Sequence, residues 1–521
     1  MSKRTRTLLI GGIVVVVLAV LLAVLLLLPP ADDGDEPDTD ETGDDTSTAD
    51  TLVDKYVEDK NATQITLSSA TVTAGKNSYT IKANKDGDLL VEGWEDLPHD
   101  STAADELWDA LQTVVADRLI TETPEDPATF GFDGDAIKVE AVYSDNTTFA
   151  LEIGGEAPSG EGLYIRVPDK APVYLIDSYS LEPFFEQATH YLSKSPITVP
   201  EVKSGTENSS DKVVIRDAEL SGSVRPKPLF FQTTNALMTD TGISVSPSGY
   251  IIKKPYYRAV STNSALIQYA SFSGFTASDI AKVYPSAADL NAYGLNTPYS
   301  ACTFNLAVQH PENETDKDGE EVTTYSYYHV FKYTVKLGNK NDDGLRYAVV
   351  YAENELLPLV YLVDESAVAW AATQYDDIAD TLLFYIHIVA VDKLTVTADG
   401  VATPFKLTHI EVEGETNPDL EVKANGKTYD SDLFRDMYAG LMGIYRTGAA
   451  ESKPTGTPTY TVKLETNTDA VPDLEIKLYR TTASKYTVVH STGEMYTVDA
   501  KKLEAFMTQY RLYLKGEAAE F

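Results

Sequence analysis

Three segments of the chain combine an alternating apolar pattern with a helical pattern that follows it. They read VYLIDSYSLEPFF, VYLVDESAVAWAA and MYTVDAKKLEAFM, and they begin at Val173, Val360 and Met495. Each segment predicts a strand that ends in an aspartate and continues into a helix, where apolar residues return every three or four positions. We therefore expect one structural unit to occur three times along the chain.

The aspartates at the ends of these strands are Asp177, Asp364 and Asp499. Aspartate is a preferred N-cap because its carboxylate accepts free N–H groups of the first helical turn and lies at the positive end of the helix dipole. A catalytic or metal-binding role is the alternative, but each unit offers one carboxylate with no reactive partner nearby in sequence. We predict that the three aspartates are structural helix caps.

Upstream of each repeat lie segments in which apolar and polar residues alternate with period two, such as FALEIGG and GLYIRV, or DLEIKLY and KYTVVH. This alternation is typical of antiparallel sheets that bury one face. The predicted fold class is α+β, with three repeated modules that each pack an antiparallel β-sheet with amphipathic helices. The predicted modules span residues 61–195, 196–385 (with insertions) and 386–521 (a diverged copy).

One long helix is expected in the first module, over residues 101–119. Its apolar stripe would consist of Leu107, Leu111, Val114, Val115 and Leu119, which recur at helical spacing. In the second module, the segment PENETDKDGEEV predicts the acidic tip of a hairpin.

The N-terminus begins with a basic tip that is followed by a long apolar run. Residues 8–28 contain no charged or polar side chain, and a helix of this length matches the ~30 Å hydrocarbon core of a bilayer. Because Lys3, Arg4 and Arg6 precede the run, the N-terminus is predicted to be cytoplasmic and the later modules extracytoplasmic. A cleaved signal peptide is the alternative, although no A-x-A-like site ends the run. We predict that residues 1–30 form a cytoplasmic tip and a single-pass transmembrane anchor.

Acidic residues dominate the charge of the chain, with 80 Asp and Glu against 42 Lys and Arg and a net charge of -38. Residues 31–60 are rich in acids and are predicted to form a disordered linker. The negative charge repels phosphate backbones and argues against a nucleic-acid partner. Cys302 is the single cysteine, which excludes an intramolecular disulfide and a cysteine-based metal cluster.

No reactive motif occurs in the sequence. The seven histidines stand in no metal-ligand spacing, and neither a nucleophile elbow nor a phosphate-binding loop is present. We therefore predict no catalytic residue, no metal site and no cofactor. A hydrolase with dispersed carboxylates stays open as an alternative, because paired acids can come from distant positions.

Tyrosine is abundant, with 32 residues, and clusters in the second module. Most of these residues are expected to be ordinary strand residues, but tyrosine also suits contacts with protein or carbohydrate. The candidate partner-binding surface consists of Tyr250, Tyr256, Tyr257, Tyr325, Tyr327 and Tyr328.

Two modules share a turn in which a glycine lies between large apolar residues, Phe130-Gly131-Phe132 and Tyr293-Gly294-Leu295. This turn, the LLVEGW strand, the strand ends Ile153-Gly154 and Leu337-Gly338, and the N-terminal anchor resemble bacterial extracytoplasmic proteins of the domain-of-unknown-function family 4340. The resemblance covers about residues 61–384, and the third module lacks the turn. It implies an envelope protein, associated in some cases with ABC-type transport systems, and it implies no catalytic residues.

From these observations we expect a membrane-anchored, extracytoplasmic binding or scaffold protein rather than an enzyme. Its partner would be an envelope membrane protein or a transporter subunit. The alternative is a surface adhesin that binds the cell wall or glycans. The sequence predicts neither the ligand nor the oligomeric state.

Overall fold

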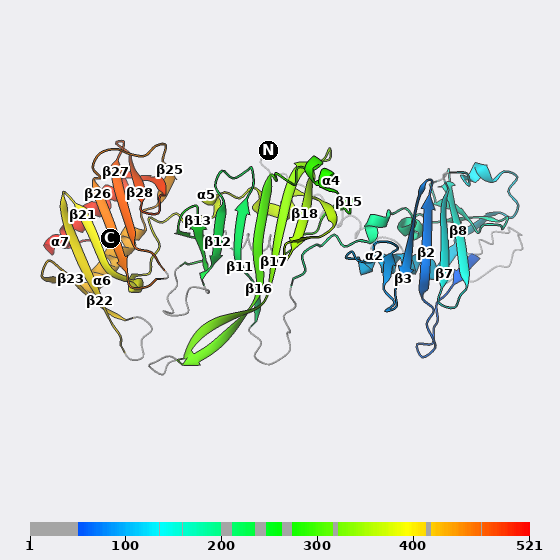
Figure 1. The fold of residues 1–521 in the computed structure, drawn as a ribbon, viewed down its shortest axis with the longest axis horizontal. Coiled ribbons are helices and arrows are strands. Elements are labelled where there is room, and N and C mark those ends of the chain that lie inside the picture. The colour runs from blue at the N-terminus through cyan, green and yellow to red at the C-terminus, as the bar shows by residue number, and fades with distance from the viewer. Residues whose placement is uncertain are drawn as a thin grey trace, which may run out of the picture.

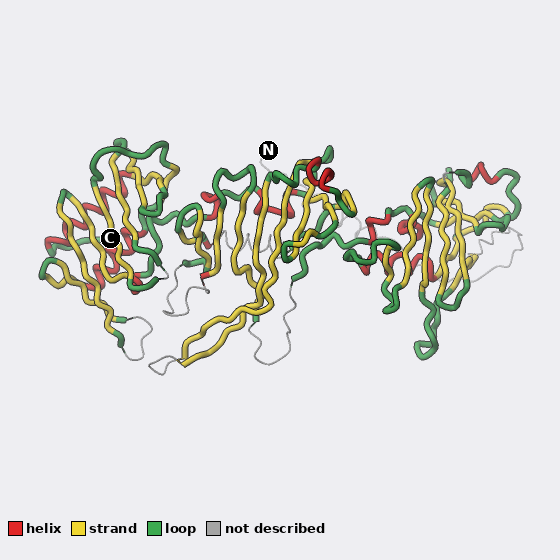
Figure 2. Tube along the Cα trace, viewed as in Figure 1, coloured by secondary structure: helices red, strands yellow, loops and turns green. Residues whose placement is uncertain are grey.

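A computed structural model describes residues 50–134, 136–158, 160–199, 211–234, 246–262, 274–315, 321–412, 418–469 and 471–521. The fold is mostly β. Three large antiparallel sheets follow one another along the chain and lie in a row (Figure 1). Helices are few and mostly short, and Figure 2 shows them beside the sheets. The predicted antiparallel sheets are confirmed, but helices form a smaller part of the described chain than an α+β fold implies.

The first sheet has eight strands in the order β4-β3-β2-β7-β8-β9-β10-β6. These strands are β2 (Leu67–Ala74), β3 (Asn77–Ala83), β4 (Leu89–Val91), β6 (Arg118–Thr121), β7 (Ile137–Tyr143), β8 (Thr148–Glu156), β9 (Leu163–Arg166) and β10 (Val173–Ile176). A separate pair joins β1 (Asp50–Asp54) to β5 (Thr113–Ala116). The helical elements of this region are α2 (Ser101–Gln112) and the 3₁₀ turns η1 (Pro127–Phe130), η2 (Tyr179–Phe184) and η3 (Ala188–Tyr191).

The second sheet has ten strands, of which nine follow the order β14-β13-β12-β11-β16-β17-β18-β20-β15. They are β11 (Lys212–Ser221), β12 (Leu229–Thr233), β13 (Tyr250–Lys254), β14 (Arg258–Ala259), β15 (Asp279–Val283), β16 (Ser300–Thr315), β17 (Glu321–Lys340), β18 (Arg346–Ala352) and β20 (Leu359–Val363), and the tenth, β19 (Glu355–Leu356), pairs with β18. The described helical elements here are α4 (Ala287–Ala292), η5 (Glu365–Ala371) and α5 (Tyr375–Ile378). The hairpin predicted at PENETDKDGEEV is confirmed, because β16 and β17 pair up to Thr315 and Glu321.

The third sheet has nine strands in the order β24-β23-β22-β21-β26-β27-β28-β29-β25. They are β21 (Val391–Ala398), β22 (Val401–Ile410), β23 (Asp419–Ala424), β24 (Lys427–Tyr429), β25 (Arg446–Ala449), β26 (Tyr460–Thr466), β27 (Leu474–Arg480), β28 (Lys485–His490) and β29 (Met495–Asp499). Its helical elements are η6 (Ile388–Ala390), α6 (Ser431–Met442) and α7 (Ala500–Lys515). The two long helices bury Phe434, Met437, Phe506 and Tyr510 in the core of this sheet.

The strand order follows one scheme in all three sheets. The first strand of the sheet pairs with the first strand of a second meander, as in β2–β7, β11–β16 and β21–β26. The strand that comes just before this second meander in the chain lies at the opposite edge of the sheet. There it pairs with the last strand of the meander, as in β6–β10, β15–β20 and β25–β29. The module boundaries given above stay predictions, but the recurring order is the arrangement that a repeated unit requires.

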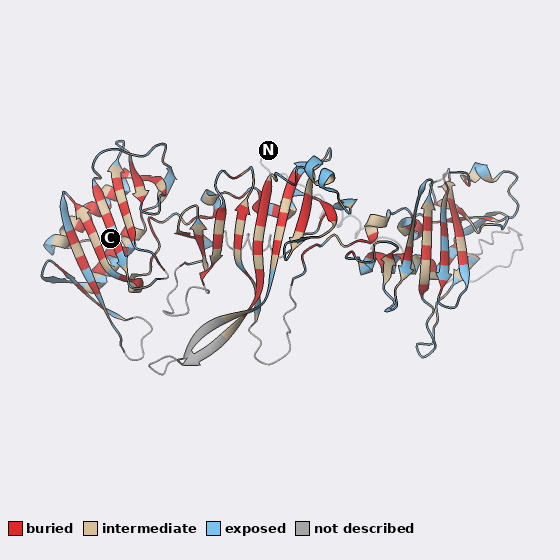
Figure 3. Cartoon of the chain, viewed as in Figure 1, coloured by how far each residue is buried: buried red, intermediate tan, exposed pale blue. Residues whose placement is uncertain are grey.

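Each sheet buries alternate side chains in its own apolar core, and Figure 3 shows the buried bands that cross the strands. The cores also touch. Leu97, Leu192 and Ile197 reach from the first region into the core of the second sheet. Ile251 of β13 packs into the core of the third sheet. Apolar contacts therefore join all three sheets.

Two expectations about the first region are wrong. The helix predicted over residues 101–119 ends at Gln112, and Thr113–Ala116 form β5 instead. The β-branched residues at 113–115 favour a strand, and β1 supplies the partner. Because β1 begins at Asp50, the predicted disordered linker of residues 31–60 also contains a strand.

None of the helices that the structure describes is long and apolar enough to cross a membrane. The predicted anchor, residues 8–28, and residues 31–49 of the predicted linker lie outside the described part of the chain.

Candidate binding site

The six tyrosines proposed as a binding surface lie in two separate places. Tyr250 is in β13, and Tyr256 and Tyr257 follow it directly, whereas the other three lie on β17. Three strands stand between β13 and β17, a separation of about 19 Å at the usual strand spacing. The six residues therefore do not form one surface.

The first group makes contacts within the second region and with the core of the third sheet. The ring of Tyr256 lies 5.5 Å from that of Tyr375, and its hydroxyl accepts a hydrogen bond of 2.8 Å from Lys227. Tyr257 packs against the core of the third sheet, and this burial raises the pKa of its hydroxyl. Tyr250 packs its ring on Phe231 within its own sheet. These tyrosines contribute to contacts inside the molecule.

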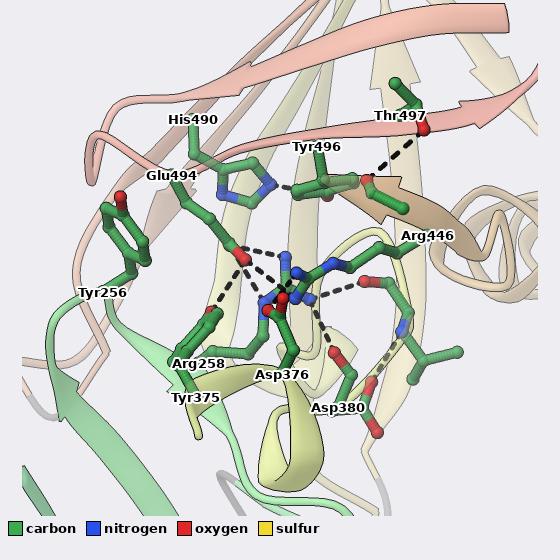
Figure 4. A network of polar contacts seen from close by, with 12 residues as sticks. Tyr256, Arg258, Tyr375, Asp376, Asp380, Arg446, His490, Glu494, Tyr496 and Thr497 are labelled. Carbon is green, nitrogen blue, oxygen red and sulfur yellow. Dashed lines mark hydrogen bonds and ion pairs between the residues drawn. The ribbon is translucent and has the colours of Figure 1, made fainter. Parts of the chain in front are cut away.

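Beside Tyr256, a group of charged residues joins the second and third sheets (Figure 4). Arg258 donates to Glu494 Oε2 from Nε at 3.0 Å and from Nη2 at 2.7 Å. The other carboxylate oxygen, Oε1, accepts from the Tyr375 hydroxyl at 2.7 Å and from Arg446 Nη1 at 3.4 Å. Arg446 also pairs with Asp376. We call these five residues the seam.

The seam is buried and well supplied with hydrogen bonds. The side chains of Arg258 and Glu494 are only 4% and 2% exposed. Arg258 donates further from Nη1 to the carbonyl oxygens of Asp380 and Leu382, at 3.2 and 2.7 Å. A buried ion pair needs such additional partners, because both charges have lost their hydration. The guanidinium of Arg258 also lies over the ring of Tyr496.

The titratable groups around the seam are not suited to acid–base catalysis. Burial, together with the charge of Glu494, raises the pKa of Tyr375, and burial raises that of Tyr496 to about 12. Burial, reinforced by Arg258, lowers the pKa of His490 to about 3. A general acid or base works best with a pKa near the working pH, so these three groups stay neutral at pH 7. The arrangement fits a structural joint.

The second group of tyrosines lies where β16 and β17 continue past their sheet. β11 pairs with β16 as far as Gln309, and β18 pairs with β17 as far as Tyr333. Beyond these points the two strands pair with each other as a two-stranded arm, which Figure 1 shows projecting from the sheet. We define the arm as residues 310–315 and 321–331. Tyr325 lies on it, and its side chain is outside what the structure describes.

The arm exposes apolar side chains near its base. Tyr328, Val330 and Phe331 are 39%, 41% and 38% exposed, whereas Val335 on the same strand is 1% exposed. Tyr327 is half-buried, and its hydroxyl accepts a hydrogen bond of 3.3 Å from Gln309. Exposed apolar residues that follow one another on a strand are typical of a contact surface.

A polar group ties the base of the arm to β11. Asp211, directly before β11, contacts His310 Nδ1 at 2.5 Å and accepts a hydrogen bond from the Tyr328 hydroxyl. These two contacts lower the pKa of the Asp211 carboxyl. The same hydrogen bond raises the pKa of Tyr328. The contacts fix where the arm leaves the sheet.

The three predicted helix caps lie at the starts of helical segments. Asp364 and Asp499 occupy the N-cap positions of η5 and α7 and accept N–H groups of Ser366 and Lys502, each at 2.8 Å. Asp177 lies one residue before the N-cap of η2 and accepts the N–H of Ser180 at 3.0 Å. Two of these segments are 3₁₀ turns, so α7 alone is the amphipathic α-helix that the pattern predicts.

The glycine turn shared by the first two modules packs against a second glycine. Gly131 has φ +79°, a left-handed conformation that glycine adopts without strain. A side chain at Gly154 would collide with the carbonyl oxygen of Phe130, and one at Gly338 with that of Tyr293. The glycines on β8 and β17 thus allow the backbone of the turn to lie directly against the strand. This close contact explains why the glycine of the turn and the glycine of the strand occur together in both modules.

In the part of the chain that the structure describes, no observation favours the hydrolase alternative. A cleft of about 520 Å³ beside α2 is lined by the acids Glu106, Asp109, Glu182 and Glu186. A carboxylic acid that donates a proton near pH 7 needs a raised pKa. The carboxyl groups whose pKa values are shifted in the described chain are all shifted downwards. Within the same residues, no three metal-ligating side chains gather as they would around an ion.

The fold and the site define a class: a β-rich protein of three sheets in a row, with a projecting two-stranded arm. Residues 91–238 match the model of the family described as Domain of unknown function (DUF4340). Over these residues the match confirms the resemblance to the family that the sequence predicts, and it does not bear on the N-terminal anchor. No curated protein and no solved structure matches the chain.

Proposed function

We propose that this chain is a membrane-anchored, extracytoplasmic binding protein whose arm holds an envelope membrane protein, such as the membrane subunit of a transporter. The observation that carries the proposal is the arm: two strands that leave their sheet and expose Tyr328, Val330 and Phe331. Soluble proteins rarely expose contiguous apolar residues on a projecting strand without a partner.

The proposal includes three copies of one module, held outside the cell by residues 8–28. The recurring strand order supports a common origin of all three sheets, and the paired glycines support it for the first two. The uncharged run of residues 8–28 and the basic residues before it support an anchor with a cytoplasmic N-terminus. Among the described residues, a two-stranded projection as long as the arm occurs in the second sheet and not in the other two, which fits a copy that has acquired a binding role.

A wall-binding or glycan-binding adhesin is the second candidate. It depends on a shared tyrosine surface, and three of the six tyrosines instead make contacts inside the molecule. The adhesin therefore has less support than a protein partner.

The test is cross-linking in living cells followed by affinity purification of the full-length chain. The arm variant carries Val330→Lys and Phe331→Lys. The matched control carries Val401→Lys and Ile410→Lys, which replace two exposed residues of β22 that are 65% and 50% exposed. We expect a membrane protein to be recovered with the wild type and the control but not with the arm variant.

Two results would contradict the proposal. The first is the absence of any reproducible membrane partner. The second is retention of the wild type on purified cell wall, which would favour the adhesin. Protease treatment of intact cells tests the topology, since a C-terminal tag should be cleaved and an N-terminal tag protected.

A further inference from the structure

The outer edge of β17 is available for strand pairing along the arm. Lys332 is the last residue of this edge with partners on the β18 side: its N–H donates to Glu353 Oε1 at 2.7 Å, and its carbonyl accepts the N–H of Glu353 at 2.9 Å. From Phe331 to Glu321, β17 pairs only with β16 among the described residues. Such an edge presents N–H and C=O groups that a further strand can use.

A bulge marks the point where this edge begins. Leu306 and Val308 of β16 lie opposite Phe331 and Tyr328, so β17 contributes one more residue than β16 over this stretch. His329, within the bulge, has φ +48°. Bulges bend and twist a strand. This one lies where the arm leaves β18, so the edge turns away from the sheet that would otherwise cover it.

Three large side chains beside this edge are mainly apolar, and the sequence of the arm is acidic. Tyr328, Val330 and Phe331 are exposed. Over residues 310–315 and 321–331 the sequence has three acidic residues and no Lys or Arg. Two basic residues lie at the base of the arm, since Lys332 follows Phe331 and Arg216 lies over the ring of Tyr327. The net charge of -38 of the whole chain therefore carries the charge argument, and it favours a segment that alternates apolar with basic residues.

The charge also argues against a second copy of this chain as the occupant. Two arms placed edge to edge would bring like charges together on molecules that each carry a net charge of -38. Like charges across an interface disfavour association. A partner of opposite charge does not have this cost.

We infer that the outer edge of β17 binds its partner by strand addition, taking up an extended segment with alternating apolar and basic residues. This inference rests on the proposed function and names the way in which the arm recognises its partner. Main-chain hydrogen bonds would supply affinity, and Tyr328, Val330 and Phe331 would select the apolar side chains.

The test uses the full-length chain in nanodiscs of zwitterionic lipid, with empty nanodiscs as the blank. The probe is a short fluorescent peptide of alternating Val and Lys. The controls are a Val and Glu peptide and a Val and Lys peptide interrupted by Pro, which cannot pair along its length. We expect the first peptide to bind and both controls to fail. We also expect bound peptide to slow hydrogen exchange at the amides of residues 326–331.

Two variants make the test specific. Val330→Lys removes an apolar contact and adds a charge that repels the probe, so it should weaken binding about tenfold or more. Ile410→Lys, on an exposed strand of the third sheet, should leave binding unchanged. Weaker binding could also result if Val330→Lys unfolds the arm. Hydrogen exchange of the peptide-free variant tests this, and the exchange rates of its β16 amides should match those of the wild type.

Three results would overturn strand addition: equal binding of the Val and Glu peptide, protection that lies outside residues 326–331, or a dimer of the chain that Val330→Lys abolishes. These results are separable from failure of the proposed function. If a membrane partner is captured through the arm while the β17 amides stay unprotected, the function stands and strand addition falls. If the peptide protects the edge but no membrane partner is found, strand addition stands and the proposed function fails.

Discussion

The seam and the arm both contain tyrosines of the second predicted module, but their surroundings are opposite. At the seam, Tyr375 donates to Glu494, which forms a buried ion pair with Arg258; the side chains of Arg258 and Glu494 are 4% and 2% exposed. The ring of Tyr256 packs on that of Tyr375. On the arm, Tyr328 is 39% exposed beside an unpaired strand edge. An aromatic cluster in the sequence therefore does not identify a binding surface. What separates the two regions is whether another part of the chain already occupies the face.

Among changes to the residues of the seam and of the arm, the largest effect should come from breaking the ion pair of the seam. Glu494→Ala leaves Arg258 buried without its carboxylate, which typically costs about 3–5 kcal/mol. We expect the contact between the second and third sheets to open, with faster hydrogen exchange at the amides of β14 and β29. The measurement is native-state hydrogen exchange of the full-length chain with increasing urea.

A double variant separates the charge from the packing. Arg258→Met combined with Glu494→Leu removes both charges, and it should recover most of the lost stability, because an apolar pair can replace a buried ion pair. If Glu494→Ala exchanges as slowly as the wild type, the seam is not the joint that we describe.

The second prediction concerns pH and His490. The pKa of this buried imidazole is lowered from its ordinary value of 6.5 to about 3, by burial first and Arg258 second. Because the folded state binds its proton less readily, the stabilisation is complete above pH 6.5 and is lost as the pH falls toward 3. The loss amounts to a few kcal/mol at most, since one pKa unit corresponds to about 1.4 kcal/mol.

His490→Gln isolates this contribution from the other titrating groups. Glutamine keeps an N–H for the carbonyl of Leu383, which His490 Nε2 contacts at 3.1 Å, but it does not titrate. Arg258 and Tyr496 lie near the imidazole and keep their charge states over this range. The wild type should therefore lose more stability than His490→Gln between about pH 6.5 and 4 in urea titrations. Parallel curves would show that the imidazole is already solvated in the fold.

Alternation predicted the sheets well because each strand buries one face. Ile137–Tyr143 and Leu474–Arg480 both alternate buried and more exposed residues, as their sequences indicate. The helix over residues 101–119 failed beyond Gln112 because its strand partner comes from Asp50–Asp54, about sixty positions away. Local patterns carry no information about such a partner.

The binding region was predictable only in part. The sequence predicts the hairpin of the arm. It does not predict where β11 and β18 stop pairing with β16 and β17, which sets the length of the arm. The seam was missed entirely. Arg258 and Glu494 are 236 positions apart. A single charged residue in or next to an apolar strand looks the same in the sequence whether its side chain is exposed or forms a buried ion pair.

A smaller effect is expected when the seam loses one neutral donor. Tyr375→Phe removes the hydroxyl that donates to Glu494 Oε1 at 2.7 Å. Because Arg446 still contacts this oxygen, we expect a loss of about 1–2 kcal/mol. The measurement is again urea-dependent exchange at β29. Tyr179→Phe, at a residue that is 78% exposed, is the matched control and should change nothing. Equal effects of the two variants would mean that the hydroxyl is hydrated.

The smallest effect on stability should come from a substitution in the arm. A small effect would confirm that the arm, unlike the seam, does not pack against another part of the chain. Val330→Lys places a charge on a residue that is 41% exposed, and such surface changes usually stay within about 0.5 kcal/mol. Val335→Lys, five positions along the same strand but 1% exposed, should unfold the second sheet because it buries an unpaired charge. Urea titration of both variants measures the difference. If Val330→Lys destabilises the chain by several kcal/mol, this face of the arm packs within the molecule and is not free to meet a partner.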